Sequence, residues 1–417
     1  MAEFFNVLPP DEARRLFLQH IRPLGDTETL PALAALGRIT HDAIVAPHSL
    51  PTFRRSTMDG YAVRATDTHG AGESLPALLQ VIGEVPMGRA ASYVLNTGQA
   101  VVIHTGGMLP DTADAVVQIE HTQIVGGLNP AQFPYEIEVG RSVACGQNVI
   151  QIGEDVAANT EILPAGSRLR PQDVGGLLAL GIGQVVLVRQ PRVAIISTGD
   201  EVVPPDTPLG PGQIHDINSY TIAGQVFQAG GEAEIMGIVP DDLPALGAAA
   251  AQALAKADML VISAGSSVSV RDRTIEVIEA LGQPGVLLHG VATRPGKPTI
   301  LGVVDGKPVL GLPGNPVSAM VQFVMFGVPA IYRLQGVSRA DIKERLWARL
   351  EQNIASASGR EDYIPARLVD AGQGMLAVPI FGKSNLIYTL VQADGLIKVP
   401  LNVGGLIAGD LVEVLLL

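Results

Sequence analysis

The chain has 417 residues, with 28 Lys and Arg against 41 Asp and Glu, which gives a formal charge of −13 at pH 7. This length predicts two to four domains, and 47% hydrophobic with 17% charged residues excludes a mostly disordered chain. The acidic balance argues against nucleic-acid binding but permits a small anionic substrate in a local basic pocket. The single cysteine, Cys145, excludes an internal disulfide framework and a cysteine-rich zinc site.

An amphipathic helix is expected near the N-terminus, where residues 11–21 place Ala13, Leu16, Phe17 and Ile21 on one face, with Asp11 as N-cap. The N-terminus lacks the uninterrupted apolar core of a secretory signal. The longest apolar stretch, residues 174–188, is too short and too glycine-rich to cross a bilayer. We therefore expect a cytoplasmic protein without a membrane segment.

The remaining chain changes its pattern three times. Residues 75–140 alternate short β-like runs with turn residues, which predicts an all-β module, and residues 171–181 predict a helix. From 186 to 335, fully apolar strands alternate with helices, which is typical of a parallel sheet covered on both faces. Residues 340–417 return to short strands and glycine turns and indicate a small β domain or barrel.

Three apolar strands of the α/β region run into small or polar loops, at residues 198–201, 264–267 and 315–318. Ligands bind at the carboxyl ends of parallel strands, and N–H groups at helix starts bind anions. Asp200, Glu201 and Asp272 lie on these loops, and carboxylates beside phosphate pockets commonly hold Mg²⁺. A single such loop is more often an ordinary cap or turn, but three at one sheet edge favour a site.

The segment Arg294-Pro-Gly-Lys297-Pro lacks the spacing of a P-loop, because Pro298 follows the lysine. The stiff turn still fixes a cation, although a surface turn with a solvated lysine explains it equally well. The eight histidines show no metal-ligand spacing and are interpreted as structural or solvated.

Taken in order, the motifs resemble the molybdopterin molybdenumtransferase family, of the MoeA and gephyrin E-domain type. The resemblance covers essentially the whole chain, and its specificity comes from the ordered set rather than from any single motif. The matching segments are STMDGYAV (56–63), TGQAVVIHTGGMLPDTADAVVQIE (97–120), GQNVIQIGEDV (146–156), PRVAIISTGDEVV (191–203), GQIHDINSY (212–220), the loop 263–274, RPGKPTILG (294–302), GLPGNPVSAM (311–320) and ADGLIKVPLNVGGLIAGDLVEV (393–414).

The resemblance implies a multidomain α/β fold with four domains. These are a discontinuous N-terminal lobe (1–50 with 141–182), a β-rich module (51–140), a three-layer α/β molybdopterin-binding domain (183–335) and a C-terminal β-barrel (336–417). It also implies a homodimer, with the site between the α/β domain of one protomer and parts of the other. Protein partners could include molybdopterin adenylyltransferase and molybdoenzymes, whereas neither nucleic acid nor a membrane is expected.

The implied reaction inserts molybdate into adenylylated molybdopterin with Mg²⁺, cleaving the adenylyl bond and releasing molybdenum cofactor and AMP. By resemblance, Asp59, Thr105, Glu201 and Asp272 are catalytic, Glu201 and Asp272 are also metal ligands, and Asp59 comes from the other protomer. Arg294, Lys297 and Ser318 would hold oxyanion or phosphate, and Arg360, Arg367 and Ser384 match a region facing the cleft. The other expected substrate-binding residues are Thr198, Gly199, Asp200, Ser263, Gly265, Ser267, Pro295, Gly296, Pro298, Pro313, Gly314, Asn315 and Pro316.

The sequence also departs from the family pattern. Where the family pattern is close to SGGVSxGxxD, Ala264 and Ser269 replace glycines and Val270 replaces a frequent acid, and Ile150 stands where an NIRxxGED pattern has arginine. A side chain at a position that needs positive φ is costly. These departures leave open a non-catalytic paralogue that acts as a molybdopterin carrier or scaffold, and a tungstate insertase. Because the four catalytic residues survive, an active enzyme is favoured.

Overall fold

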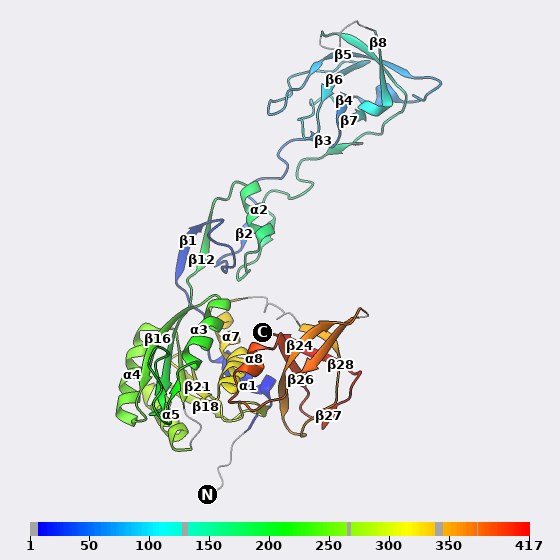
Figure 1. Ribbon diagram of the computed structural model, residues 1–417. Coiled ribbons are helices and arrows are strands. Elements are labelled where there is room, and N and C mark those ends of the chain that lie inside the picture. Colours follow the sequence, from blue (N-terminus) through cyan, green and yellow to red (C-terminus); the bar gives the residue numbers. More distant parts are fainter. Residues whose placement is uncertain (1–6, 127–131, 265–267, 338–344, 373) are drawn as a thin grey trace. The chain divides into compact units, whose positions relative to one another are not determined.

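Figure 1 shows the computed structural model of the chain, which describes residues 7–126, 132–264, 268–337, 345–372 and 374–417. The chain forms two compact units. The first comprises Met1–Asp42, Ala165–Pro171 and Gln184–Leu417, and the second comprises Ala43–Pro164 and Gln172–Gly183. Each unit contains its own buried apolar clusters, as expected for bodies that pack independently.

The first unit contains a six-stranded sheet. In spatial order its strands are β16 (Glu232–Val239), β13 (Arg192–Thr198), β17 (Met259–Ala264), β21 (Lys307–Pro313), β20 (Ile300–Val304) and β18 (Pro284–His289). The first four run parallel, which confirms the prediction for them. The pairs β21–β20 and β20–β18 are antiparallel, so the prediction of a fully parallel sheet was wrong at this edge. The reason is the turn at Asp305-Gly306, with φ of 51° and 87°, which joins β20 and β21 as a hairpin instead of a helical crossover.

Helices cover both faces of this sheet, as predicted. They are α3 (Asn218–Gln228), α4 (Leu243–Lys256), α5 (Val268–Leu281), α6 (Pro316–Gln322) and α7 (Val328–Leu334). Side chains alternate along β13, so Val193 and Ile195 pack into the cluster that holds Ile222 of α3, whereas Ala194 and Ile196 pack on the side of α4. Burial on both faces is therefore why this strand is apolar at consecutive positions.

Helix α1 (Pro10–Gln19) closes the α3 side of the core. Ala13, Phe17 and Ile21 are buried in that cluster, which confirms the predicted face. Asp11 was wrongly predicted as the N-cap: Pro9 occupies that position and Asp11 lies in the first turn. The fixed φ of Pro10 suits the first helical position, so the helix starts two residues earlier than an N-cap at Asp11 would indicate.

Helices α6 and α7 are joined by a π-helical turn, Phe323–Gly327, into one helical stretch, Pro316–Leu334. Among the described residues, this is the one helix long and apolar enough to cross a membrane by length and composition. However, 78% of its most apolar window is buried inside the protein. It is therefore explained as a core helix, and it, rather than residues 174–188, is the most membrane-like segment described.

The C-terminal part of the first unit is a closed β-barrel, as predicted. Its strands are β22 (Arg345–Leu350), β24 (Glu361–Asp370), β25 (Met375–Pro379), β26 (Gly395–Val399) and β28 (Leu411–Leu416). A short strand from the α/β region, β19 (Thr293–Arg294), pairs parallel with β24 and places Arg294 opposite Asp362. This pairing anchors the Arg294–Pro298 turn on the barrel, which matters for the site.

Smaller elements complete the first unit. They are α8 (Tyr388–Val391) and three two-stranded ladders, β1 (Thr27–Pro31) with β12 (Gln184–Val188), β14 (Val202–Val203) with β15 (Ile214–His215), and β23 (Ile354–Ala355) with β27 (Gly405–Leu406). The ladder of β14 and β15 extends from the loop that follows β13, so it lies beside the carboxyl edge of the large sheet.

The second unit is dominated by a six-stranded sheet, in agreement with the predicted all-β module. In spatial order its strands are β7 (Ala115–Gln118), β4 (Gly60–Val63), β6 (Gln99–Ile103), β5 (Ala77–Glu84), β9 (Tyr135–Val139) and β8 (Thr122–Gly126). The unit also holds two short ladders, β2 (Ile44–Val45) with β11 (Glu161–Leu163) and β3 (Arg55–Ser56) with β10 (Val149–Ile150). The predicted helix is present as α2 (Pro171–Ala179).

Candidate active site

The carboxyl ends of three adjacent parallel strands, β13, β17 and β21, lie together at one edge of the large sheet. Their registers pair Ser197 with Ser263 and Ala264 with Pro313. Asn218, at the start of α3, donates from Nδ2 to Ser263 Oγ at 2.8 Å and to the Gly314 carbonyl at 2.9 Å. The expectation that these loops share one edge is confirmed, and Asn218 joins two of them.

Unpartnered polar atoms gather at the same edge. Thr198 Oγ1, Asn218 Oδ1 and Ser219 Oγ are buried and have no hydrogen-bond partner within the described part of the chain. A buried polar atom without a partner costs free energy, and native structures keep few of them. A ligand with hydrogen-bonding groups would supply the missing partners of these three side chains, so this sheet edge has the character of a binding site.

The loop after β13 presents its acids close to the backbone. A Cβ added to Gly199, whose φ is +143°, would lie 2.9 Å from Glu201 Oε2 and 2.8 Å from Val202 Cγ2. Glycine is thus required here so that the Glu201 carboxylate can fold back over the loop. Within the described part of the chain, the Asp200 side chain makes one long hydrogen bond, accepting the Asp241 N–H at 3.4 Å.

Glu201 and Asp272 could take a divalent cation. Both are exposed, and neither side chain has a hydrogen-bond or ion-pair partner among the described residues. No group of three or more metal-binding side chains gathers within the described ranges, so a dedicated protein cage is not present there. Mg²⁺ typically uses one or two carboxylates together with water and substrate phosphates, and two free carboxylates fit that requirement.

Two of the predicted loop positions, Gly265 and Ser267, lie outside the described residues. The neighbouring Ala264 ends β17 in extended pairing with Pro313. Within the described chain, non-glycine residues with positive φ are confined to Asn148, Asn159 and Asp305. Ala264 therefore carries no backbone strain, and a glycine is not needed at this position.

A cavity of about 920 Å³ lies between the Arg294–Pro298 turn, the start of α6 and the barrel. Many of the predicted binding residues line it, namely Arg294, Pro295, Gly296, Lys297, Pro298, Pro313, Asn315, Ser318, Arg360 and Ser384. We call it the cationic pocket, because its described lining also includes Lys383 and holds a single carboxylate, Asp362. Local positive charge thus forms within an acidic protein, as the composition permitted.

The walls of the cationic pocket are fixed by hydrogen bonds. Asn315 Nδ2 donates to Ser384 Oγ at 3.1 Å, and the Val317 N–H donates to the Ser384 carbonyl at 3.1 Å, so the start of α6 is tied to the loop before α8. The fully buried Gln322 donates from Nε2 to Thr293 Oγ1 at 3.1 Å and to the Pro295 carbonyl at 2.8 Å. These contacts fix the backbone of the turn that carries Arg294 and Lys297.

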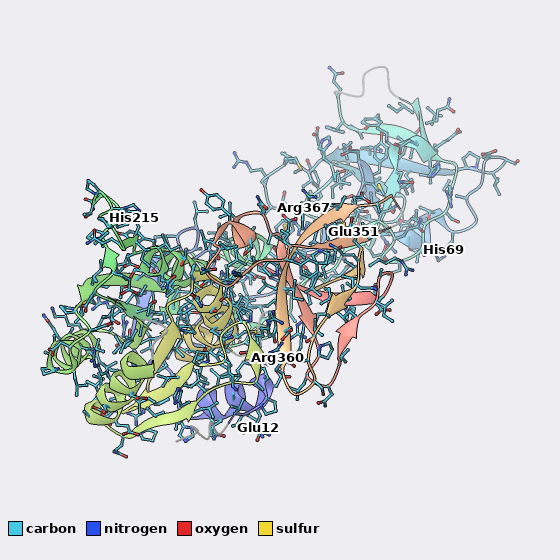
Figure 2. The ribbon with its side chains drawn as sticks, turned by 60° about the horizontal axis from the view of Figure 1, so that its bottom comes forward. Glu12, His69, His215, Glu351, Arg360 and Arg367 are labelled. Carbon is cyan, nitrogen blue, oxygen red and sulfur yellow. The ribbon has the colours of Figure 1, made fainter. Side chains whose placement is uncertain are left out.

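Arg367 does not belong to this pocket. It is exposed on the outer half of β24, whereas Arg360 lies just before that strand and lines the cavity (both are labelled in Figure 2). Gly314 and Pro316 also lie outside the lining, although Gly314 contacts Asn218. Arg360 precedes β24, whereas Arg367 is the seventh residue of that extended strand, so the two predicted arginines lie at different places on the barrel.

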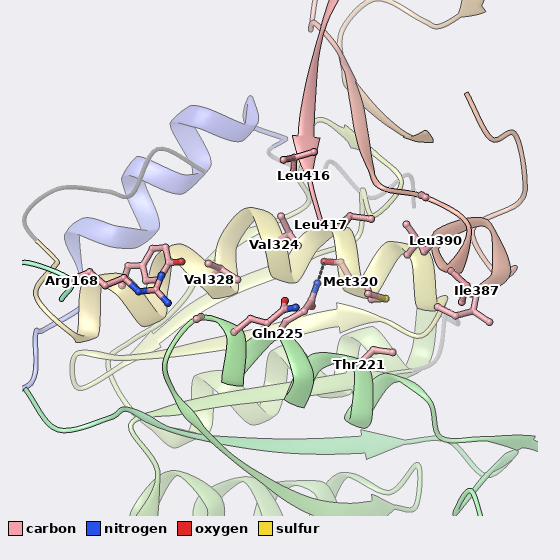
Figure 3. A pocket seen from close by; sticks show the side chains of 15 residues that line it. Arg168, Thr221, Gln225, Met320, Val324, Val328, Ile387, Leu390, Leu416 and Leu417 are labelled. Atoms are coloured by element: carbon pink, nitrogen blue, oxygen red, sulfur yellow. Dashed lines mark hydrogen bonds between the residues drawn. The ribbon is translucent and has the colours of Figure 1, made fainter. Parts of the chain in front are cut away.

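A second cavity of the first unit, about 810 Å³, has a different character (Figure 3). It lies between α3, the α6–α7 stretch and α8, and Gln225 Nε2 reaches the Met320 carbonyl across it at 3.3 Å. Its described lining is mainly apolar and carries one charged side chain, Arg168. An oxyanion or phosphate would therefore be bound in the cationic pocket rather than here.

In the second unit, the predicted residues Asp59 and Thr105 are in direct contact. Asp59 Oδ1 accepts the Thr105 N–H at 2.8 Å and the Thr105 hydroxyl at 3.2 Å, because β4 and β6 pair at Gly60 and Ile103. The Thr105 N–H bond keeps the pKa of Asp59 below its ordinary value. Desolvation opposes this effect, whereas the Thr105 hydroxyl and the nearby His104 support it. Asp59 is therefore an ionised, exposed carboxylate at neutral pH.

His104, interpreted from the sequence as structural or solvated, lies between two carboxylates. Its Nε2 is 2.9 Å from Glu84 Oε1 and its Nδ1 is 3.8 Å from Asp59 Oδ1. It therefore contributes to the surroundings of Asp59, which spacing along the chain alone could not reveal.

Comparisons with known proteins agree along the whole chain. Family models match in order: the MoeA N-terminal region (domain I and II) at residues 8–181, a probable molybdopterin binding domain at 194–333, and the MoeA C-terminal region (domain IV) at 347–417. A molybdopterin molybdenumtransferase of Nostoc sp. is 34% identical over 403 residues, 95% of this chain and 88% of that protein. The Bacillus subtilis protein of the same name is 33% identical over 420 residues, which cover 100% of this chain and 96% of that protein.

The chain belongs to the molybdopterin molybdenumtransferase family. Membership places it among the transferases of molybdenum cofactor biosynthesis. A crystal structure of a molybdopterin biosynthesis MoeA protein from Pyrococcus horikoshii OT3 agrees in fold, with a TM-score of 0.85, 32% identity, and coverage of 99% of this chain and 100% of that one.

Four residues of the site were missed by reasoning from the sequence: Asn218, Ser219, Asp362 and Lys383. Asn218 lies inside the quoted GQIHDINSY segment, and a polar residue at a helix start that follows a strand was a signal for it. Lys383 is adjacent to the predicted Ser384 and could have been included on that ground. Asp362 had no such signal, because an acid beside Arg360 in the sequence reads as an ordinary surface charge.

Proposed function

We propose that this protein inserts molybdate into adenylylated molybdopterin, with cleavage of the adenylyl bond and release of molybdenum cofactor and AMP. The observation that carries the proposal is the cationic pocket, which holds Arg294, Lys297, Arg360 and Lys383 in a chain of net charge −13. Both substrates are anions, and this is where the described chain concentrates positive charge around a cavity.

Molybdate is the ligand that this pocket suits best on chemical grounds. Guanidinium groups present forked N–H donors that match pairs of oxyanion oxygens, and lysine adds a point charge. The hydroxyls of Ser318 and Ser384 and the side-chain amide of Asn315 offer further donors on the same wall. Tungstate shares the charge and shape of molybdate and would use the same contacts.

The pterin substrate would extend towards the strand ends. Thr198, Asn218 and Ser219 carry the buried polar atoms that lack partners there, and Asn218 also contacts Gly314 beside the cationic pocket. A substrate with hydrogen-bonding groups at one end and phosphate at the other therefore matches a neutral subsite next to a cationic one.

Glu201 and Asp272 are the proposed holders of Mg²⁺. When bound, the cation would neutralise negative charge on the phosphate bridge and so favour departure of AMP. Glu201 is kept over its loop by Gly199, and its carboxylate has no competing partner among the described residues. The role of these residues in this chain is therefore to supply hard oxygen ligands at the edge of the sheet.

The active form is proposed to be a cytoplasmic homodimer. Asp59 and Thr105 of one protomer would then act on the substrate held in the cationic pocket of the other. In support, the Asp59 side chain is 63% exposed and keeps its charge through the Thr105 contact. Molybdopterin adenylyltransferase would supply the substrate, and molybdoenzymes would receive the product.

The testing experiment measures AMP release and cofactor formation from adenylylated molybdopterin, Mg²⁺ and molybdate, with tungstate in a parallel series. We expect turnover by the wild type, and its loss in Glu201→Ala and Asp272→Ala. Glu279→Ala removes another exposed acid from α5 and should keep full activity. Binding of the pterin without AMP release by the wild type would reject the insertase in favour of a carrier or scaffold.

A further inference from the structure

Beneath the cationic pocket lies a buried carboxylate whose oxygens face two of the pocket's arginines. Asp362 is 2% exposed, yet it lines the cavity at the start of β24. We propose that Asp362 is a positioning residue, which orients Arg294 and Arg360 so that their remaining N–H groups point at a bound oxyanion. The proposal rests on the proposed function of the pocket and adds a residue that neither the sequence motifs nor the family resemblance singled out.

The contacts of Asp362 divide its two oxygens between separate segments of the chain. Oδ1 accepts the Nε–H of Arg360 at 3.0 Å. Oδ2 accepts the Ser356 hydroxyl at 2.9 Å and lies 3.6 Å from Nη1 of Arg294. The pairing of β19 with β24 sets Arg294 directly opposite Asp362, so the backbone register creates this arrangement.

Both arginines keep donors for a ligand. Arg294 is 62% exposed and Arg360 37%, and the contacts with Asp362 are the ion pairs that the described chain gives them. Arg360 uses Nε, which leaves both terminal amino groups of its guanidinium for an anion. The Asp362 carboxylate thus restricts the rotamers of both arginines without occupying the guanidinium donors that face the cavity.

The physical advantage is preorganisation. Arginine has several freely rotating bonds, and a ligand that must immobilise two such side chains loses affinity by doing so. Asp362 orders the Arg294 and Arg360 side chains in the free protein, so the anion does not have to immobilise them on binding. Coulomb repulsion alone acts in the opposite direction, because the buried negative charge of Asp362 repels an oxyanion in the pocket. Removing the charge of Asp362 should therefore weaken oxyanion binding if preorganisation dominates, and strengthen it if Coulomb repulsion dominates.

The experiment measures binding of molybdate alone to the full-length protein by titration calorimetry. Asp362→Asn keeps the shape and removes the charge, and we expect its Kd for molybdate to rise about 10-fold, equivalent to about 1.4 kcal/mol. The matched control is Glu361→Gln, one residue earlier on β24. It removes another buried carboxylate, 7% exposed, whose partners Tyr363 and Lys398 are not the pocket arginines.

A general loss of barrel stability would lower the melting temperature of both variants, whereas the positioning role changes molybdate affinity in Asp362→Asn alone. Arg360→Ala tests the pocket itself and should also lose affinity. If Arg360→Ala binds weakly but Asp362→Asn binds as tightly as the wild type or more tightly, the positioning role is overturned and the pocket assignment stands. If Arg360→Ala binds molybdate normally, the pocket assignment fails and the role of Asp362 fails with it.

Discussion

Gly296→Ala tests how the cationic pocket is held. Gly296 has φ +102°, and a Cβ there would lie 2.3 Å from Cγ and 2.5 Å from Nε2 of Gln322. Cγ is not the free end of the side chain, so the buried Gln322 must move and lose its two hydrogen bonds to Thr293 and Pro295. The substitution therefore combines backbone strain with the loss of the support under Arg294 and Lys297.

The magnitude follows from these contacts. Backbone strain at positive φ costs about 1 kcal/mol, and each lost hydrogen bond costs about 1 kcal/mol, giving about 3 kcal/mol in the free energy of unfolding. The first unit spans nearly 300 residues, so its melting temperature should fall by about 5 °C. Because the two cations on the turn shift as well, we expect the KM for molybdate to rise about 10-fold.

Calorimetric melting and steady-state kinetics measure the two effects, with two controls. Gly37→Ala places alanine at φ +76° with no atom within 4 Å of its Cβ, so it isolates the backbone cost of about 1 kcal/mol. In a Gln322→Ala background, Gly296→Ala should likewise cost only about 1 kcal/mol, since the obstructing side chain is absent. An equal cost in both backgrounds would refute the reasoning.

Two further predictions concern the roles of individual side chains. Mixing inactive Asp59→Ala and Arg360→Ala proteins under subunit exchange should restore about a quarter of wild-type activity, because about half of the dimers are mixed and each mixed dimer contains one intact site. No recovery of activity would contradict a site shared between protomers. As a control, Arg367→Ala should be fully active by itself. Thr105→Val should raise the pKa of Asp59 in an NMR titration while leaving it below the ordinary value, because the backbone N–H remains. Since the native pKa is depressed, Asp59 contributes to stability above its unfolded pKa and loses this as the pH falls through the native one; an unchanged titration would contradict the contact.

Several features were predictable because they depend on local sequence patterns. Consecutive apolar residues in β13 and β17 indicated strands buried on both faces, and their polar ends indicated a site at one edge. The antiparallel hairpin of β20 and β21 was also recoverable in principle, because Asp305-Gly306 is a strong turn signal between two apolar runs. It was missed because alternation with helices suggested a crossover.

By itself, the sequence determined the order of the elements, the sheet edge that carries the site and the residue types available for anion binding. Only the tertiary structure decided which of those residues meet. Strand register set Arg294 against Asp362 and turned Arg367 outward, and packing of α3 brought Asn218 to Ser263 and Gly314. Local patterns follow from the periodicity of one element, whereas these contacts join segments distant in the chain, whose meeting depends on how complete elements pair and pack.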